Sequence, residues 1–190
     1  MKGARTYTKV RRAAAEEATR ERIVSALMAL HEEIGPARTT VSAVAERAGV
    51  ERLTVYRHFP DEPSMLRACS AHWNSLHPPP AICSPTDDPL ADFRRTLLRL
   101  YVWYRENAAM LIQINTDARK MPVVAELIAP FADHLDAMAA ELDRRWPKRN
   151  ARRAQTIRHA LDFSTWHSLG RIAGDDRRAA ALAVSWLNAA

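Results

Sequence analysis

The sequence has little glycine and little cysteine. Only five glycines occur among its 190 residues, whereas alanine, leucine, arginine and glutamate are abundant. This composition favours helix throughout the chain. The two cysteines, Cys69 and Cys83, are too few for a disulfide framework or a four-cysteine metal site, and they indicate a reduced intracellular compartment.

Segments that could enter or cross a membrane are also missing. The basic start of the chain is followed by Glu16 and Glu17 rather than by an apolar stretch, so we do not expect a secretory signal. The most apolar window, AAALAVSWLNAA at the end of the sequence, is too short to span a bilayer. We therefore expect a cytoplasmic protein without a membrane partner.

Patterns that carry catalysis are absent as well. The sequence has no nucleophile elbow, no phosphate-binding loop and no paired catalytic carboxylates. Its seven histidines include no pair at helical i, i+4 spacing with a plausible third metal ligand. These absences predict a protein that is not an enzyme and that needs neither a metal nor another cofactor.

Positive charge is concentrated in the first third of the chain. Residues 1–60 contain eleven Lys and Arg against seven Asp and Glu, which accounts for +4 of the net charge of +6. No acidic residue lies among the first fifteen, where the basic residues are Lys2, Arg5, Lys9, Arg11 and Arg12. This basic arm is either a solvated tail or an arm that contacts the phosphates or the minor groove of DNA.

The hydrophobic periodicity predicts an all-α chain of about nine helices, because no stretch alternates as a strand would. Helices are expected over about 13–34, 41–48, 52–59, 61–77, 88–106, 107–115, 121–146 with an interruption at Pro130, 150–173 and 175–189. The prolines of HPPPAICSPTDDP (77–89) predict a loop. We expect two helical domains, one over residues 1–60 and one over residues 61–190.

Residues 41–59 have the pattern of a helix-turn-helix. Ala45 is small where the two helices would cross, and Gly49 lies where the turn needs a left-handed backbone. Small apolar side chains would hold the two helices together at Val44, Ala48, Val50 and Val55. The second helix then presents Arg52, Thr54, Arg57 and His58 outward, with Tyr56 near the rim, as a helix in the major groove would.

The segment TTVSAVAERAGVERLTVYRHFPDEPSML resembles the DNA-binding segment of the tetracycline-repressor-like (TetR) family of transcriptional regulators, most closely in GV-x-x-x-TVYRHF. The resemblance implies an N-terminal three-helix domain followed by a helical domain that dimerises and binds a ligand. It also implies base contacts at Arg52, Leu53 and Thr54, phosphate contacts at Thr40, Tyr56 and His58, either kind at Arg57, and an occasional base contact at Ser42. Glu62 departs from the pattern, because many relatives have a phosphate-contacting lysine there.

Two sets of residues in the C-terminal part are candidates for the family's other two roles. A dimer interface is expected along the last two helices, at Ile157, Leu161, Thr165, Ser168, Leu182, Ala183 and Trp186. A ligand pocket is expected where aromatic and histidine side chains converge, at Trp73, Tyr101, Trp103, Tyr104, Phe131, His134, Phe163, Trp166 and His167. Both sets could instead belong to the ordinary hydrophobic core.

The resulting hypothesis is a ligand-responsive transcriptional regulator. We expect a repressor that binds a near-palindromic double-stranded DNA operator as a homodimer and that loses DNA affinity when a small molecule binds the C-terminal domain. The alternative is a helical protein-interaction module without sequence-specific DNA binding.

Overall fold

The computed structural model describes the backbone of residues 2–189 and the side chains of residues 9–187. All regular secondary structure within residues 2–189 is helical, which confirms the predicted all-α class. Lys2 and Arg5, two members of the basic arm, lie outside the residues whose side chains are described.

The chain divides into two compact units. The first unit is formed by Met1–His77 and Ala109–Leu127, and the second by Pro78–Ala108 and Ile128–Ala190. The assignment of DNA binding to residues 1–60 and of effector binding to residues 61–190 stays a prediction.

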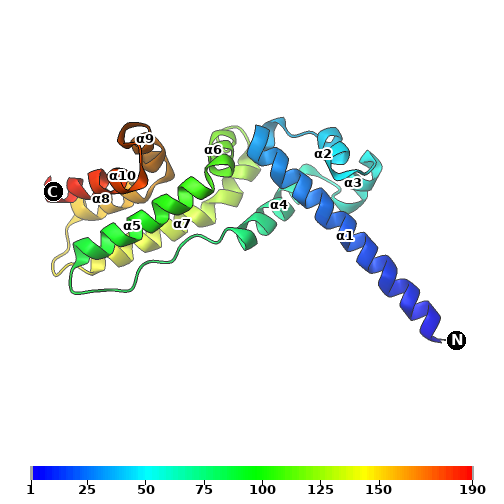
Figure 1. The fold of residues 1–190 in the computed structure, drawn as a ribbon, viewed down its shortest axis with the longest axis horizontal. Coiled ribbons are helices and arrows are strands. Elements are labelled where there is room, and N and C mark those ends of the chain that lie inside the picture. Colours follow the sequence, from blue (N-terminus) through cyan, green and yellow to red (C-terminus); the bar gives the residue numbers. More distant parts are fainter. Residues whose placement is uncertain (1, 190) are drawn as a thin grey trace. The chain divides into compact units, whose positions relative to one another are not determined.

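The first unit is built around one long helix (Figure 1). Its elements are α1 (Lys2–Ile34), a 3₁₀ turn (Pro36–Arg38), α2 (Val41–Ala48), α3 (Arg52–His58), α4 (Glu62–Leu76), α6 (Ala108–Asp117) and the beginning of α7 (Pro122–Arg144). α1 packs against α2 and α4, and α2 packs against α3. The buried side chains of this core are Ile23, Val24, Ala26, Leu27, Leu30, Val44, Ala45, Ala48, Val55, Phe59, Met65 and Cys69.

The second unit is centred on α5. Its elements are α5 (Pro89–Glu106), the remainder of α7, α8 (Ala151–Leu161), α9 (Phe163–Ala173), α10 (Asp176–Ser185) and a 3₁₀ turn (Trp186–Ala189). α5 packs against α8, α9 and α10 through the stripe that its periodicity predicts, because Phe93, Leu97, Leu100, Tyr101 and Tyr104 are all fully buried. The predicted loop before α5 is confirmed, since residues 78–88 contain no helix.

The first helix is longer than the sequence pattern predicts, because it begins at Lys2 rather than near Ala13. Adding residues to an already anchored helix avoids the cost of nucleation, and alanine, arginine and lysine are good helix formers. The basic arm is therefore a continuation of α1.

Two predictions about helix breaks are wrong. Pro130 lies inside the continuous helix α7 and does not interrupt it. The residues that follow it, Leu135, Met138 and Leu142, are buried, and their packing offsets the roughly 3 kcal/mol that a proline costs inside a helix.

The predicted helix over 150–173 is instead two helices, separated at Asp162, whose backbone is extended at ψ 141°. Asp162 accepts a hydrogen bond from the Ser164 amide at 2.9 Å and so caps α9. The hydroxyls of Tyr101 and Tyr104 donate to the carbonyls of Ala160 and Leu161 at 2.8 and 2.7 Å. These bonds satisfy both helix ends at the break.

Candidate nucleic-acid interface

Helices α2 and α3 form a helix-turn-helix with defined ends. Thr40 begins α2, and its side-chain oxygen accepts a hydrogen bond from the Ala43 amide at 3.2 Å. Gly49 ends α2 in the left-handed conformation, at φ 63° and ψ 43°, and its amide donates to the carbonyls of Ala45 and Glu46. The structure thus confirms the turn that the glycine predicts.

Small apolar side chains hold the two helices together. Val44, Ala45 and Ala48 are buried on α2, and Val50 is half-buried in the turn. On the other side, Val55 and Phe59 are 0% and 2% exposed and anchor α3 to the core of the first unit. One face of α3 is therefore fixed by burial, so its other face must point to solvent.

That other face carries the side chains predicted to bind DNA. Arg52, Leu53, Tyr56 and Arg57 are exposed, and Leu53 reaches 75% exposure. Thr54 and His58 are half-buried at its edges. The exposed face thus combines two guanidinium groups and a phenol on a short helix narrow enough for the major groove.

The two candidate contacts on α2 are also accessible. Ser42 and Thr40 are exposed at the beginning of the helix. The Thr40 hydroxyl oxygen accepts the capping hydrogen bond, so its proton is still available for donation to a phosphate oxygen. Glu62 is exposed in the first turn of α4, where an acidic side chain is favourable.

Three arginines, two on α1 and one on α2, fix the position of the motif against α1, and sequence reasoning missed them. Arg22 donates to the Ala48 carbonyl at the end of α2 at 3.3 Å. Arg47 forms two hydrogen bonds with Glu33, at 2.5 and 2.8 Å, which lower the pKa of that carboxyl. The Arg20 guanidinium lies 4.9 Å from the centre of the Phe59 ring. No local pattern reveals these partners, because each pair joins residues on different helices.

Beneath the interface, the core holds a neutral pair. His31 Nδ1 lies 3.4 Å from Cys69 Sγ, and both side chains are buried. Burial lowers the pKa of His31 to about 4 and raises the pKa of Cys69 to about 12. At neutral pH the core between α1 and α4 therefore carries an uncharged imidazole and a protonated thiol.

A comparison with known protein families matches the segment that contains the helix-turn-helix. Residues 23–69 match the model described as "Bacterial regulatory proteins, tetR family". The match contains α2, α3 and the exposed side chains described above. Residues 23–69 therefore carry the DNA-binding segment of the TetR family.

Solved structures agree with this TetR-family fold. One is named "Clostridium perfringens putative fatty acid metabolism regulator"; it is 15% identical, with a TM-score of 0.62, and the match covers 86% of this chain and 94% of that one. Another is a "putative TetR-family transcriptional regulator" from Mesorhizobium loti; it is 16% identical, with a TM-score of 0.60, and the match covers 92% of this chain and 96% of that one. No curated protein matches the sequence. The family match over residues 23–69 supports a DNA-binding transcriptional regulator.

Most residues predicted to bind an effector do converge, within the second unit. Tyr104 is central, and its ring centre lies 5.3 to 6.4 Å from those of Tyr101, Trp103, Phe131, Phe163 and Trp166. His134 and His167 stack on this aromatic cluster at Phe131 and Phe163. Trp73 belongs to the first unit, where it stacks on His77 at 5.0 Å. Effector binding by these residues stays a prediction.

The residues predicted to form a dimer interface differ in exposure. Ile157, Leu161, Thr165 and Ala183 are buried within this chain, and Trp186 is half-buried against His159. Ser168 on α9 and Leu182 on α10 are exposed. These two side chains are the members of the set that face solvent.

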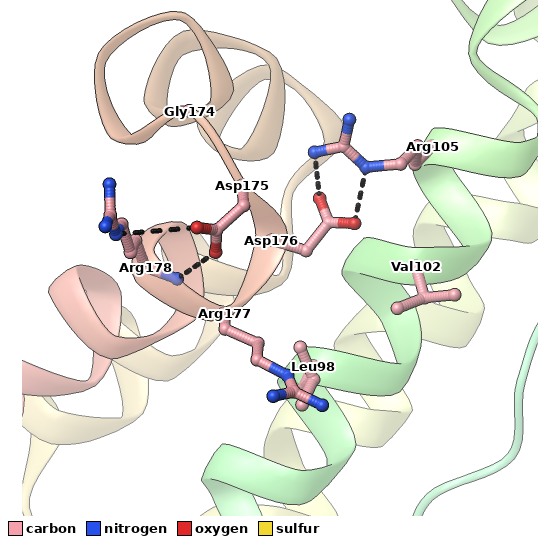
Figure 2. Close-up of a pocket in the computed structure, with 8 residues that line it drawn as sticks. All are labelled: Leu98, Val102, Arg105, Gly174, Asp175, Asp176, Arg177 and Arg178. Atoms are coloured by element: carbon pink, nitrogen blue, oxygen red, sulfur yellow. Dashed lines mark hydrogen bonds and ion pairs between the residues drawn. The ribbon is translucent and has the colours of Figure 1, made fainter.

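A surface hollow of about 590 Å³ lies between α5 and the beginning of α10 (Figure 2). Leu98 and Val102 form its apolar side, while Asp176 pairs with Arg105 at 2.6 and 2.9 Å. Asp176 also accepts a hydrogen bond from Trp166 Nε1 at 3.0 Å. None of the residues predicted to bind an effector lines this hollow.

Two further searches gave negative findings for the described part of the chain. None of its helices combines the length and the apolar character needed to cross a membrane. No three of its histidine, cysteine, aspartate and glutamate side chains are grouped so that they could hold a metal ion.

Proposed function

We propose that this TetR-family protein is a repressor that binds a near-palindromic DNA operator as a homodimer and releases it when a small molecule binds. The observation that carries the proposal is that one face of α3 is buried and the opposite face is exposed. Val55 and Phe59 are fixed in the core, while Arg52, Tyr56 and Arg57 are left exposed on the opposite face. These three side chains do not contribute to the packed core, whereas the major groove offers them hydrogen-bond partners.

Each contact follows from the chemistry of its side chain. Arg52 begins α3, so its guanidinium can donate to O6 and N7 of one guanine together. Tyr56, His58 and the Thr40 hydroxyl offer single donors, which suit phosphate oxygens along the groove walls. Arg57 can reach either kind of acceptor, while Leu53, Thr54 and Ser42 complete the surface facing the bases.

Exposed apolar side chains in the second unit support the homodimer. Leu182 is 41% exposed on α10, and Ile172 is 77% exposed near the end of α9, where Ser168 is also exposed. A two-fold axis would bring the same patch of both subunits together. Two subunits would then present two α3 helices to successive major grooves, which accounts for a near-palindromic site.

The aromatic cluster around Tyr104 supports an effector site. The cluster is flanked by His134, whose Nε2 atom is buried and has no hydrogen-bond partner among the described residues. A ligand that opens the cluster and accepts or donates at this nitrogen would satisfy it. Tighter ligand binding to a conformation whose α3 helices do not fit the operator would weaken DNA binding by the same factor.

Selection of bound duplexes from a randomised pool tests the proposal directly. We expect enrichment of one near-palindromic sequence, with affinity that falls steeply as salt concentration rises. Equal affinity for the selected and the unselected duplexes would contradict the proposal and favour a protein-interaction module.

Arg52→Ala should reduce affinity for the selected operator by roughly 5- to 150-fold, which corresponds to about 1–3 kcal/mol. It should also relax the base preference at one position of each half-site, because the bidentate guanine contact is lost. The matched control is Arg94→Ala, which removes an exposed arginine from α5 and should leave DNA binding unchanged. Fluorescence anisotropy with operators substituted at each base pair provides the measurement.

A further inference from the structure

Residues 9–18 of α1, the projecting segment, extend from the first unit without packing against it. Every residue from Lys9 to Ala18 is exposed, including Val10 at 62%. Figure 1 shows this part of the helix, in dark blue, continuing beyond α2, α3 and α4. Helices of globular proteins are stabilised mostly by burying an apolar face, and this segment buries none. Packing within the chain therefore does not explain it.

The first charged residues of the projecting segment are all basic. Lys9, Arg11 and Arg12 precede the first acidic residues, Glu16 and Glu17. Lys9 and Arg12 are three residues apart and so lie on the same side of the helix. Neither takes part in an ion pair with another described residue. The segment thus presents cationic side chains that are open to an external anion.

The projecting segment begins beside the DNA-facing helix. The Arg20 guanidinium covers the ring of Phe59, the residue that ends α3. Lys9 lies eleven residues and Arg12 eight residues before this contact, which is about 16 and 12 Å along the helix axis. The offset of Lys9 exceeds the width of a major groove, which is about 12 Å, and the offset of Arg12 matches it. With α3 in the major groove, side chains this far along α1 from the Phe59 contact can lie outside the groove that α3 occupies.

We propose that the projecting segment of α1 is a second DNA-contacting element, in which Lys9 and Arg12 bind backbone phosphates flanking the half-site read by α3. The inference rests on the proposed docking of α3 in the major groove. Phosphates are the natural partner, because they supply a regular array of negative charge at this reach. The contacts strengthen binding without reading sequence, since neither cation is held in a fixed geometry that could select a base.

The test compares Lys9→Ala/Arg12→Ala with the charge-matched control Arg94→Ala/Arg149→Ala, which removes two exposed arginines from the second unit. Affinity is measured between about 50 and 200 mM salt. Two duplexes are used: the selected operator trimmed to its half-sites, and the same operator extended by one helical turn, about 10 base pairs, at each end.

For the double variant, we expect weaker binding to the extended duplex and a salt dependence reduced by about 0.9 in log–log slope per lost phosphate contact. The loss should vanish on the trimmed duplex, and the selected base sequence and the melting temperature should not change. The control should behave as wild type on both duplexes.

Three results would overturn the inference: an unchanged salt slope on the extended duplex, an equal loss in the control, or an equal loss on both duplexes. Failure of the proposed function would look different. In that case wild type itself would show no sequence preference, whatever the double variant did.

Discussion

Gly35 joins α1 to the 3₁₀ turn with a φ of +84°, and a Cβ atom at this position would lie 2.6 Å from Asp117 Oδ2. The same carboxylate oxygen accepts a hydrogen bond from the Ala37 amide at 2.9 Å. Gly35 therefore combines a backbone at φ 84° and ψ 158°, a region essentially confined to glycine, with a close approach to a carboxylate that holds the following turn.

Gly35→Ala should destabilise the protein by more than the ~1–2 kcal/mol that a left-handed backbone costs a residue with a Cβ atom. Gly174→Ala is the comparison, because Gly174 is left-handed at φ 80° and ψ −24° and has nothing within 4 Å of an added Cβ, so its loss reports the left-handed backbone alone. Urea denaturation of both variants measures the difference. Equal losses would show that the contact with Asp117 contributes nothing.

His31 makes the stability of the first unit depend on pH. Burial lowers its pKa from 6.5 to about 4, so the unfolded chain binds a proton at a higher pH than the folded one does. Stability from this residue is complete above about pH 6.5 and is lost as the pH falls toward 4. Denaturation midpoints between pH 7 and 4 should decrease in wild type and should decrease less in His31→Gln.

Among the helices, the elements with clear end signals could be predicted from the sequence. Gly49 and Asp61 are local signals, and the structure places them at the ends of α2 and α4 as expected. The continuity of α7 through Pro130 and the break at Asp162 could not be predicted, because distant partners decide them. Buried side chains hold α7 together, and hydroxyls from α5 satisfy the end of α8.

The segment before α5 is held in place by one buried carboxylate. Asp92 is fully buried and accepts hydrogen bonds from the amide and hydroxyl of Thr86, from Arg95 and from Arg145. The Thr86 amide, followed by its hydroxyl and the two arginines, outweighs burial and lowers the pKa of Asp92 from 3.8 to about 2. Asp92 therefore ties residues 83–88 to α5 and to the end of α7.

Because this pKa is lower in the folded state, the ionised Asp92 stabilises the protein fully above about pH 3.8 and less as the pH falls toward 2. Asp92→Asn keeps the size of the side chain but removes its charge. We expect it to be less stable than wild type at pH 5, with a difference that shrinks toward pH 2. Guanidinium denaturation at several pH values tests this, and a constant difference would contradict it.

For the molecule as a whole, the exposed face of α3 could be predicted because one short segment contains it. Arg52 to His58 and their buried counterpart Val55 follow one another on a single helix, so burial and exposure follow from helical periodicity. The arginines that position this helix, such as Arg22 at Ala48, could not be found, since tertiary packing alone brings them to it. Dimer and effector residues depend on a second subunit and a ligand, and they stay predictions.

The oligomeric state can be tested at Leu182 on α10. Leu182→Arg should convert the dimer to a monomer and reduce operator affinity, because a charge would replace an apolar side chain in the proposed interface. Val102→Arg is the matched control, since Val102 on α5 is 40% exposed, close to the 41% of Leu182, and lies outside the proposed interface. Sedimentation velocity over a range of concentrations distinguishes the two. A dimeric Leu182→Arg protein would contradict the proposed placement.

The contrast between the buried and the exposed face of α3 has a consequence for engineering. Val55 and Phe59 hold the helix in place, so the residues on its open side can be exchanged without rebuilding the scaffold beneath them. A library randomised at Arg52, Leu53 and Arg57 should therefore yield folded variants with new target sites. The chain can thus serve as a frame for reprogrammable genetic switches.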